Sequence, residues 1–109
     1  MTGQPAACYR LVMSSCQCEG IESRFDAAYA AQKLERYRRN GPDSTTRALV
    51  DALSREGVQG MTLLDIGGGV GAVQHELLRS GVASVVEVEA SAAYQDACRE
   101  EAERQGHAE

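Results

Sequence analysis

Residues 62–73 read TLLDIGGGVGAV, an apolar run that contains one acid, Asp65, and is followed by four glycines within five positions. A short apolar run bounded by glycine is typical of a strand covered on both faces of a parallel sheet. Glycine has no Cβ atom and allows positive φ, so the chain can turn sharply and a ligand can approach the backbone closely. This stretch therefore predicts a buried strand, a tight turn and a helix whose first N–H groups are free to meet an anionic group.

The segments around this turn alternate between helical and strand patterns. Helical periodicity and capping residues predict helices over residues 21–39, 44–56, 72–80 and 91–105. Short apolar runs predict strands over residues 61–66 and 83–88. Because two such strands joined by a helix form a parallel unit, we predict an α/β fold in which N-terminal helices are followed by a βαβα unit.

Length and charge limit the classes of protein that this chain can represent. With 109 residues and 43% hydrophobic content, it forms at most one ordinary globular domain. No apolar run approaches the ~18 residues that a membrane-spanning helix needs, and no basic segment precedes the first apolar residues, so we expect a cytoplasmic protein without membrane contact. The net charge of −5 disfavours nucleic-acid binding, and the basic cluster over residues 33–39 is expected to be a solvated helix end.

The four cysteines do not indicate a metal centre. Cys16-x-Cys18 is tighter than the usual spacing of a zinc knuckle, and no second pair completes four ligands. Because nothing else suggests secretion, we expect Cys8, Cys16, Cys18 and Cys98 to be free thiols in a reducing compartment. No metal is predicted, and the roles of the three N-terminal cysteines are left open.

The glycine turn fits a dinucleotide ligand. Gly67-x-Gly69-x-x-Ala72 matches the relaxed dinucleotide fingerprint, and Glu89 lies 22 residues after Gly67, close to the ~20 expected for an acid that binds a ribose. A fragment of an NAD(P)-dependent oxidoreductase is therefore one alternative. A non-enzymatic interaction module, which pairs the open edge of its sheet with a partner chain, is another.

A longer pattern also includes the acid before the turn. The run Asp65-x-Gly67-x-Gly69-x-Gly71 behind an apolar strand resembles the first motif of the class I S-adenosylmethionine-dependent methyltransferases. That motif asks for the acid and for the third glycine, which the dinucleotide fingerprint does not require. The resemblance extends to VVEVEAS over residues 85–91, since these enzymes carry an acid at the end of the second strand, here Glu89. Helices before the first strand also suit this family, and we favour it over the oxidoreductase.

The resemblance implies S-adenosyl-L-methionine as the cofactor. The residues that it assigns to cofactor binding are Asp65, Gly67, Gly69, Gly71 and Glu89. Glu89 would accept hydrogen bonds from both ribose hydroxyls. Asp65 would lie under the turn and fix its N–H groups or the cationic methionine end of the cofactor, and the glycines would line the floor of the site.

In this family the helices before the first strand also supply residues that bind the methyl acceptor. Phe25, Tyr29, Tyr37 and Arg38 are candidates for a lid over the cofactor. His75 is expected at the surface and is assigned no role. The sequence identifies neither the methyl acceptor nor a catalytic base.

The resemblance covers only the first two strands of the family's seven-stranded sheet, roughly residues 61–106. We divide the chain into a cysteine-containing arm over residues 1–20, a helical segment over 21–57 and a partial Rossmann-like βαβα unit over 60–109. The residue that reads the adenine after the third strand is absent, as are all later motifs. We therefore expect the N-terminal portion of a longer enzyme. A partner or a missing C-terminal portion would complete its sheet, and alone it would bind the cofactor weakly and have no assured activity.

Overall fold

The computed structural model describes residues 20–107, and within them the chain forms five helices and two strands. In chain order these are α1 (Ile21–Arg24), α2 (Ala27–Asn40), α3 (Ser44–Glu56), β1 (Thr62–Ile66), α4 (Ala72–Arg79), β2 (Ser84–Val88) and α5 (Ala92–Arg104). The predicted α/β class is confirmed, with helices first and a βαβα arrangement after them. Cys8, Cys16 and Cys18 lie outside the described residues.

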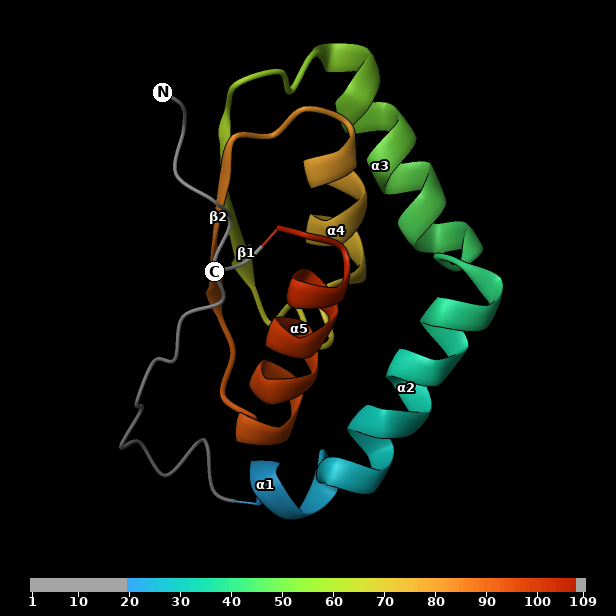
Figure 1. Cartoon of the computed structure of the whole chain (residues 1–109), viewed down its shortest axis with the longest axis vertical. Coiled ribbons are helices and arrows are strands. Elements are labelled where there is room, and N and C mark those ends of the chain that lie inside the picture. The colour runs from blue at the N-terminus through green and yellow to red at the C-terminus, as the bar shows by residue number, and fades with distance from the viewer. Residues whose placement is uncertain (1–19, 108–109) are drawn as a thin grey trace.

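The two strands form one parallel pair, in which Leu64 lies opposite Val86 and Asp65 opposite Glu87. Figure 1 shows the helices gathered on one side of this pair, with α4 and α5 next to the strands and α2 and α3 farther out. Because the strands are parallel, their carboxyl ends meet at the same edge of the sheet. The glycine turn follows β1 at that edge.

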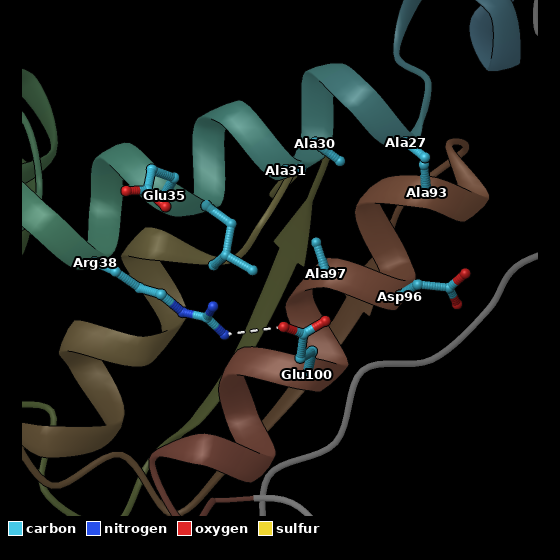
Figure 2. A pocket seen from close by; sticks show the side chains of 10 residues that line it. Ala27, Ala30, Ala31, Glu35, Arg38, Ala93, Asp96, Ala97 and Glu100 are labelled. Atoms are coloured by element: carbon cyan, nitrogen blue, oxygen red, sulfur yellow. Dashed lines mark hydrogen bonds and ion pairs between the residues drawn. The ribbon is translucent and has the colours of Figure 1, made fainter.

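Two apolar clusters hold the helices together and onto the sheet. The first joins α3, α4 and β2 through Val50, Leu77 and Val85, which are all buried. The second joins α2 and α5, where Leu34 packs with alanines such as Ala97. Figure 2 shows the alanines of α2 and α5 facing each other, and small side chains at such a contact let two helices approach closely.

The predicted helix over residues 21–39 is wrong in one respect, because a break separates α1 from α2. The Asp26 side chain accepts the Tyr29 N–H at 3.0 Å and so caps the N-terminus of α2. Phe25, just before it, has a φ of −115° and a ψ of 64°, which is not helical. An aspartate that bonds the backbone of the following turn favours a new helix start over continuation of the old helix.

The prediction that the strands are covered on both faces is wrong for residues 20–107. The inner face carries Leu63, Val85 and Glu87 and packs against the helices. On the opposite face, Leu64 is 59% exposed and Ile66 is 72% exposed. This alternation is typical of a sheet that has helices on one side only.

Two further findings concern the environment of the chain. Cys98 is fully buried on α5 and is part of a disulfide, so the prediction of a free thiol is wrong at this position.

In the part of the chain that the structure describes, no helix has the length and apolar character to span a membrane. The cytoplasmic location stays a prediction.

Candidate functional site

The glycine turn occupies residues 67–71, between the end of β1 and the start of α4. Gly67, Gly69 and Gly71 have φ angles of 70°, 62° and 92°, a region that residues with a Cβ atom rarely adopt. The Gly67 N–H donates to the Val88 carbonyl oxygen at 2.7 Å, which ties the turn to the end of β2. The backbone conformation therefore favours glycine at these three positions.

The two sides of the turn have different surroundings. Among residues 20–107, a Cβ atom at Gly67 would meet no atom within 4 Å, and Gly67 is exposed, so this side of the turn is open in the described part of the chain. Gly71 instead faces the interior, where a Cβ atom would lie 2.8 Å from both the Cys98 Sγ and the His75 Nε2 atoms. Gly71 is buried at the start of α4, so internal packing explains this glycine and it does not line the open side.

Glu89 lies directly beside the turn, at the end of the second strand. Its carboxylate accepts the Gly69 N–H at 2.9 Å and the Ser91 N–H at 2.9 Å, and the residue is only 8% exposed. A carboxylate has about four lone-pair positions, so these two bonds orient the group and leave about two positions unused. The structure thus brings the predicted acid and the predicted turn together.

Asp65 and Glu87 form an acidic pair beneath the turn. They lie opposite each other in the parallel ladder, and the Gln74 Nε2 group donates to Asp65 at 3.1 Å and to Glu87 at 2.8 Å. Gly68 lies against this pair, since a Cβ atom there would clash with both carboxylates. Glu89 makes the contact with the N–H groups of the turn that the sequence assigns to Asp65.

Glu87 is a residue of this site that sequence reasoning missed. It is fully buried, and its Oε2 atom has no hydrogen-bond partner among residues 20–107. Burial raises the pKa of Glu87 to about 8, and the charges of Asp65 and Glu89 act in the same direction. Burial also raises the pKa of Asp65. Glu87 therefore retains its proton at neutral pH. Strand alternation, which puts Glu87 on the same face as Val85, is the signal that could have identified it.

His75 is buried, although the sequence suggests a surface position. Its Nε2 atom lies 3.0 Å from the Val70 carbonyl oxygen, and its ring centroid is 5.9 Å from that of Tyr37. Burial lowers the pKa of His75 to about 4, so the imidazole is neutral at pH values near 7. The ring supports the start of α4 from inside and does not face the open side of the turn.

Three aromatic rings lie together on one flank of the turn. The ring centroid of Phe25 is 5.8 Å from that of Tyr29 and 5.5 Å from that of Tyr94, and Tyr29 and Tyr94 are 6.3 Å apart. The Tyr94 ring reaches the turn itself, because a Cβ atom at Gly69 would lie 3.7 Å from it. Two of the four lid candidates, Phe25 and Tyr29, therefore contact Tyr94, the ring that reaches the turn.

The other two lid candidates make contacts elsewhere. The Tyr37 Oη group donates to Glu76 at 2.7 Å, and the Arg38 Nε group donates to Glu101 at 2.7 Å. These bonds hold α2 against α4 and α5. Tyr37 still packs in one apolar cluster with Val70 of the turn, but neither hydrogen bond involves the turn.

A pocket of about 350 Å³ adjoins the end of the turn. Val70 and Ala72 line one side of it, and Lys33, Tyr37 and Pro42 from α2 and the following loop line another. Its volume lies within the roughly 300–1,000 Å³ that small-molecule sites have. A small molecule in this pocket would lie next to the glycine turn.

Comparison of the chain with protein-family models, with curated proteins and with solved structures found no match. The methyltransferase resemblance therefore rests on the residues of the two motifs and on their placement. Residues 20–107 contain no group of three or more His, Cys, Asp and Glu side chains that could hold a metal ion.

Proposed function

We propose that this chain binds S-adenosyl-L-methionine and functions as part of a methyltransferase with a Rossmann-like sheet. One observation carries the proposal: the Glu89 carboxylate is held against the glycine turn by the Gly69 and Ser91 N–H groups. In the family that the sequence resembles, the acid at this position binds the ribose of the cofactor.

The described residues fit an adenosyl group at the turn. No atom of residues 20–107 lies within 4 Å of the point where a Gly67 Cβ atom would stand, which favours a close approach to the backbone there. The unused lone pairs of Glu89 can accept the hydrogens of two hydroxyl groups. The Tyr94 ring beside Gly69 offers an apolar face to a nucleoside base.

The charge around the turn favours a cationic cofactor. The carboxyl groups of Asp65 and Glu89 lie at or beneath the turn, and the structure records no Lys or Arg hydrogen bond or ion pair to them within residues 20–107. Glu87, which keeps its proton at neutral pH, adds no charge. Negative charge attracts a sulfonium or ammonium group and repels the pyrophosphate of a dinucleotide. This argument supports the methyltransferase over the oxidoreductase.

The bound cofactor would supply a methyl group on a sulfonium, which leaves as a neutral thioether without needing a proton donor. The residues of this chain therefore act by positioning. Glu89 would orient the sugar, and the bare backbone at Gly67 and Gly69 would allow close contact. The pocket beside Val70 and Ala72 is the place where an acceptor would lie next to the turn.

Saturation-transfer NMR with S-adenosylhomocysteine tests the proposal, because it detects binding as weak as the millimolar range. The wild-type chain is expected to produce signals from the ribose and adenine protons of this ligand, and none from NAD under the same conditions. The substitution Glu89→Gln is expected to weaken binding at least about tenfold, because it removes charge-assisted hydrogen bonds to the ribose.

The matched control is Glu103→Gln, which removes the same charge from an exposed position on α5. Circular dichroism checks that each variant is folded. Absence of binding by the folded wild-type chain would contradict the proposal. Binding of NAD instead would favour the oxidoreductase, and equal binding by the wild type and by Glu89→Gln would remove the role assigned to Glu89.

A further inference from the structure

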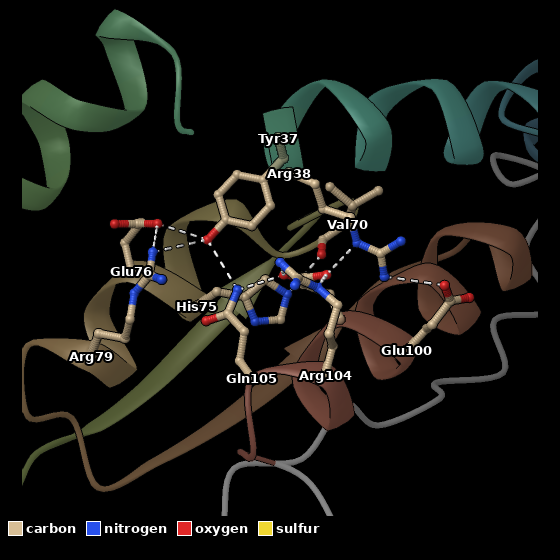
Figure 3. A network of polar contacts seen from close by, with 10 residues as sticks. Tyr37, Arg38, Val70, His75, Glu76, Arg79, Glu100, Arg104 and Gln105 are labelled. Atoms are coloured by element: carbon tan, nitrogen blue, oxygen red, sulfur yellow. Dashed lines mark hydrogen bonds and ion pairs between the residues drawn. The ribbon is translucent and has the colours of Figure 1, made fainter. Parts of the chain in front are cut away.

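Four arginines from four different helices line one pocket together with Tyr37. Arg38 comes from α2, Arg47 from α3, Arg79 from α4 and Arg104 from α5, and the pocket has a volume of about 200 Å³. We call it the arginine pocket. Figure 3 shows Arg38, Arg79 and Arg104 in one polar network with Tyr37.

Two glutamates also line the arginine pocket, and internal bonds already engage both of them. Glu101 is fully buried and accepts bonds from Arg38 at 2.7 Å, from Arg104 at 3.0 and 3.1 Å, and from Gln105 at 2.7 Å. These four bonds use about all the lone pairs of its carboxylate. Although burial acts to raise it, the bonds from Arg104, Gln105 and Arg38 lower the pKa of Glu101 to about 2.

Glu76 is the second glutamate, and it forms no hydrogen bond with Arg47. Arg79 and Tyr37 both donate to Glu76, the latter at 2.7 Å. Arg47 approaches the same carboxylate only to 4.0 Å, which is longer than a hydrogen bond. The Arg47 side chain is 54% exposed, so its N–H donors can reach a further acceptor.

The arginine pocket therefore carries an excess of positive charge. Glu76 and Glu101 line the pocket, and Glu100 also pairs with Arg38 at 3.1 Å, so four arginines against three glutamates leave a net charge of plus one, in a chain whose net charge is −5. Tyr37, which also lines the pocket, adds no negative charge, because burial raises the pKa of Tyr37 to about 12 and so keeps the phenol protonated. The positive charge of Arg79 is also felt at His75 and His107, where it adds to burial in lowering both pKa values.

From the convergence of these four guanidinium groups on one polar hollow, we propose that the arginine pocket binds a phosphate-class oxyanion. Guanidinium groups present N–H donors in a planar fork that matches the oxygens of phosphate and sulfate. The small volume suits a single anionic group, and the pocket of about 350 Å³ that shares Tyr37, Gly41 and Pro42 with it could hold the rest of a larger ligand. The proposal is independent of cofactor binding, since neither Glu89 nor any glycine of the turn lines the arginine pocket.

Titration of the wild-type chain with inorganic phosphate, at constant ionic strength set by chloride, tests this site. The arginine Nε–H signals of Arg38 and Arg104 are expected to shift in NMR spectra and to saturate, whereas chloride alone causes no such shift. Sulfate should reproduce the effect. Phenyl phosphate distinguishes the two sources of the anion: tighter binding than phosphate indicates a phosphoryl group on a larger molecule, and equal binding indicates the free ion.

Arg47→Gln is the informative substitution, because this arginine is 54% exposed and contributes no hydrogen bond to Glu76. Circular dichroism checks that the variant is folded. It is expected to weaken phosphate binding about tenfold. Arg55→Gln is the matched control, since it removes the same charge from an exposed position on the same helix. The absence of a saturable phosphate effect in the folded wild type, or equal losses in both variants, would overturn the proposal.

Discussion

The ionisation of Glu87 is expected to control the stability of the fold between about pH 5 and about pH 8. This side chain is fully buried beneath the glycine turn, and burial raises its pKa from 4.5 to about 8. In the unfolded chain the same group ionises near its ordinary value. Between the two pKa values the folded state binds more protons than the unfolded state, so stability is complete below about pH 4.5 and is lost as the pH rises through about 8.

The magnitude follows from the size of the shift. Each pKa unit corresponds to about 1.4 kcal/mol, so the free energy of unfolding falls by about 3.5 kcal/mol between about pH 5 and pH 8 through this group alone. Glutamine keeps the shape of the side chain but cannot ionise. The free energy of unfolding of Glu87→Gln minus that of the wild type should therefore increase by about 3.5 kcal/mol across this range. This is a large part of the roughly 5–15 kcal/mol that is the whole free energy of unfolding of a typical domain.

Urea unfolding followed by circular dichroism, repeated at each pH, measures this difference. Subtracting the wild-type values removes the contributions of other groups, such as His75, that titrate in both proteins. The control Glu103→Gln changes an exposed glutamate, and its effect should stay within about 0.5 kcal/mol at each pH. A difference between Glu87→Gln and the wild type that does not change with pH would refute the reasoning.

Two further predictions concern packing around the site. Tyr37→Phe should lower the free energy of unfolding by about 1.5–3 kcal/mol in urea titrations, because Glu76 loses a hydrogen bond of 2.7 Å; an unchanged value would contradict this. Gly71→Ala should cost more than about 2 kcal/mol, since its Cβ atom would lie 2.8 Å from His75 Nε2 at a φ of 92°. Gly67→Ala should lower the free energy of unfolding by only about 1–2 kcal/mol, because it strains the backbone without a clash. Equal losses at the two glycines would contradict the claim that internal packing makes Gly71 the more sensitive position.

The local patterns of the sequence predict most of the helices and strands, and they predict the glycine turn and Glu89 of the candidate site. The strand over Thr62–Ile66 and the cap of α5 by Ser91 both follow from short-range rules on apolar runs and helix starts. Parallel pairing then brings Glu89 to the glycine turn, because both strands end at the same edge. The turn and its acid can therefore be placed together without knowledge of the packing.

The features that sequence reasoning missed depend on contacts between distant segments. Glu87 and His75 are buried polar residues, and only the packed structure shows that Gln74 and the Val70 carbonyl oxygen provide their partners. The apolar residues of the strands, such as Leu64, do not reveal that one face of the sheet is exposed. Exposure of that face depends on which segments pack against the sheet.

The arginine pocket is another case. The basic cluster over residues 33–39 suggests a solvated helix end, yet Arg38 binds the buried Glu101 of α5. The other arginines of the pocket lie on three further helices and have no characteristic spacing in the sequence.

The most direct test of the central claim is a map of amide chemical shifts in the wild-type chain as S-adenosylhomocysteine is added. If the glycine turn and Glu89 form the cofactor site, the amide signals of Gly67, Gly69 and Ser91 should shift most and should saturate together. Saturable shifts confined to other parts of the fold, or no shifts at all in the folded chain, would contradict the claim.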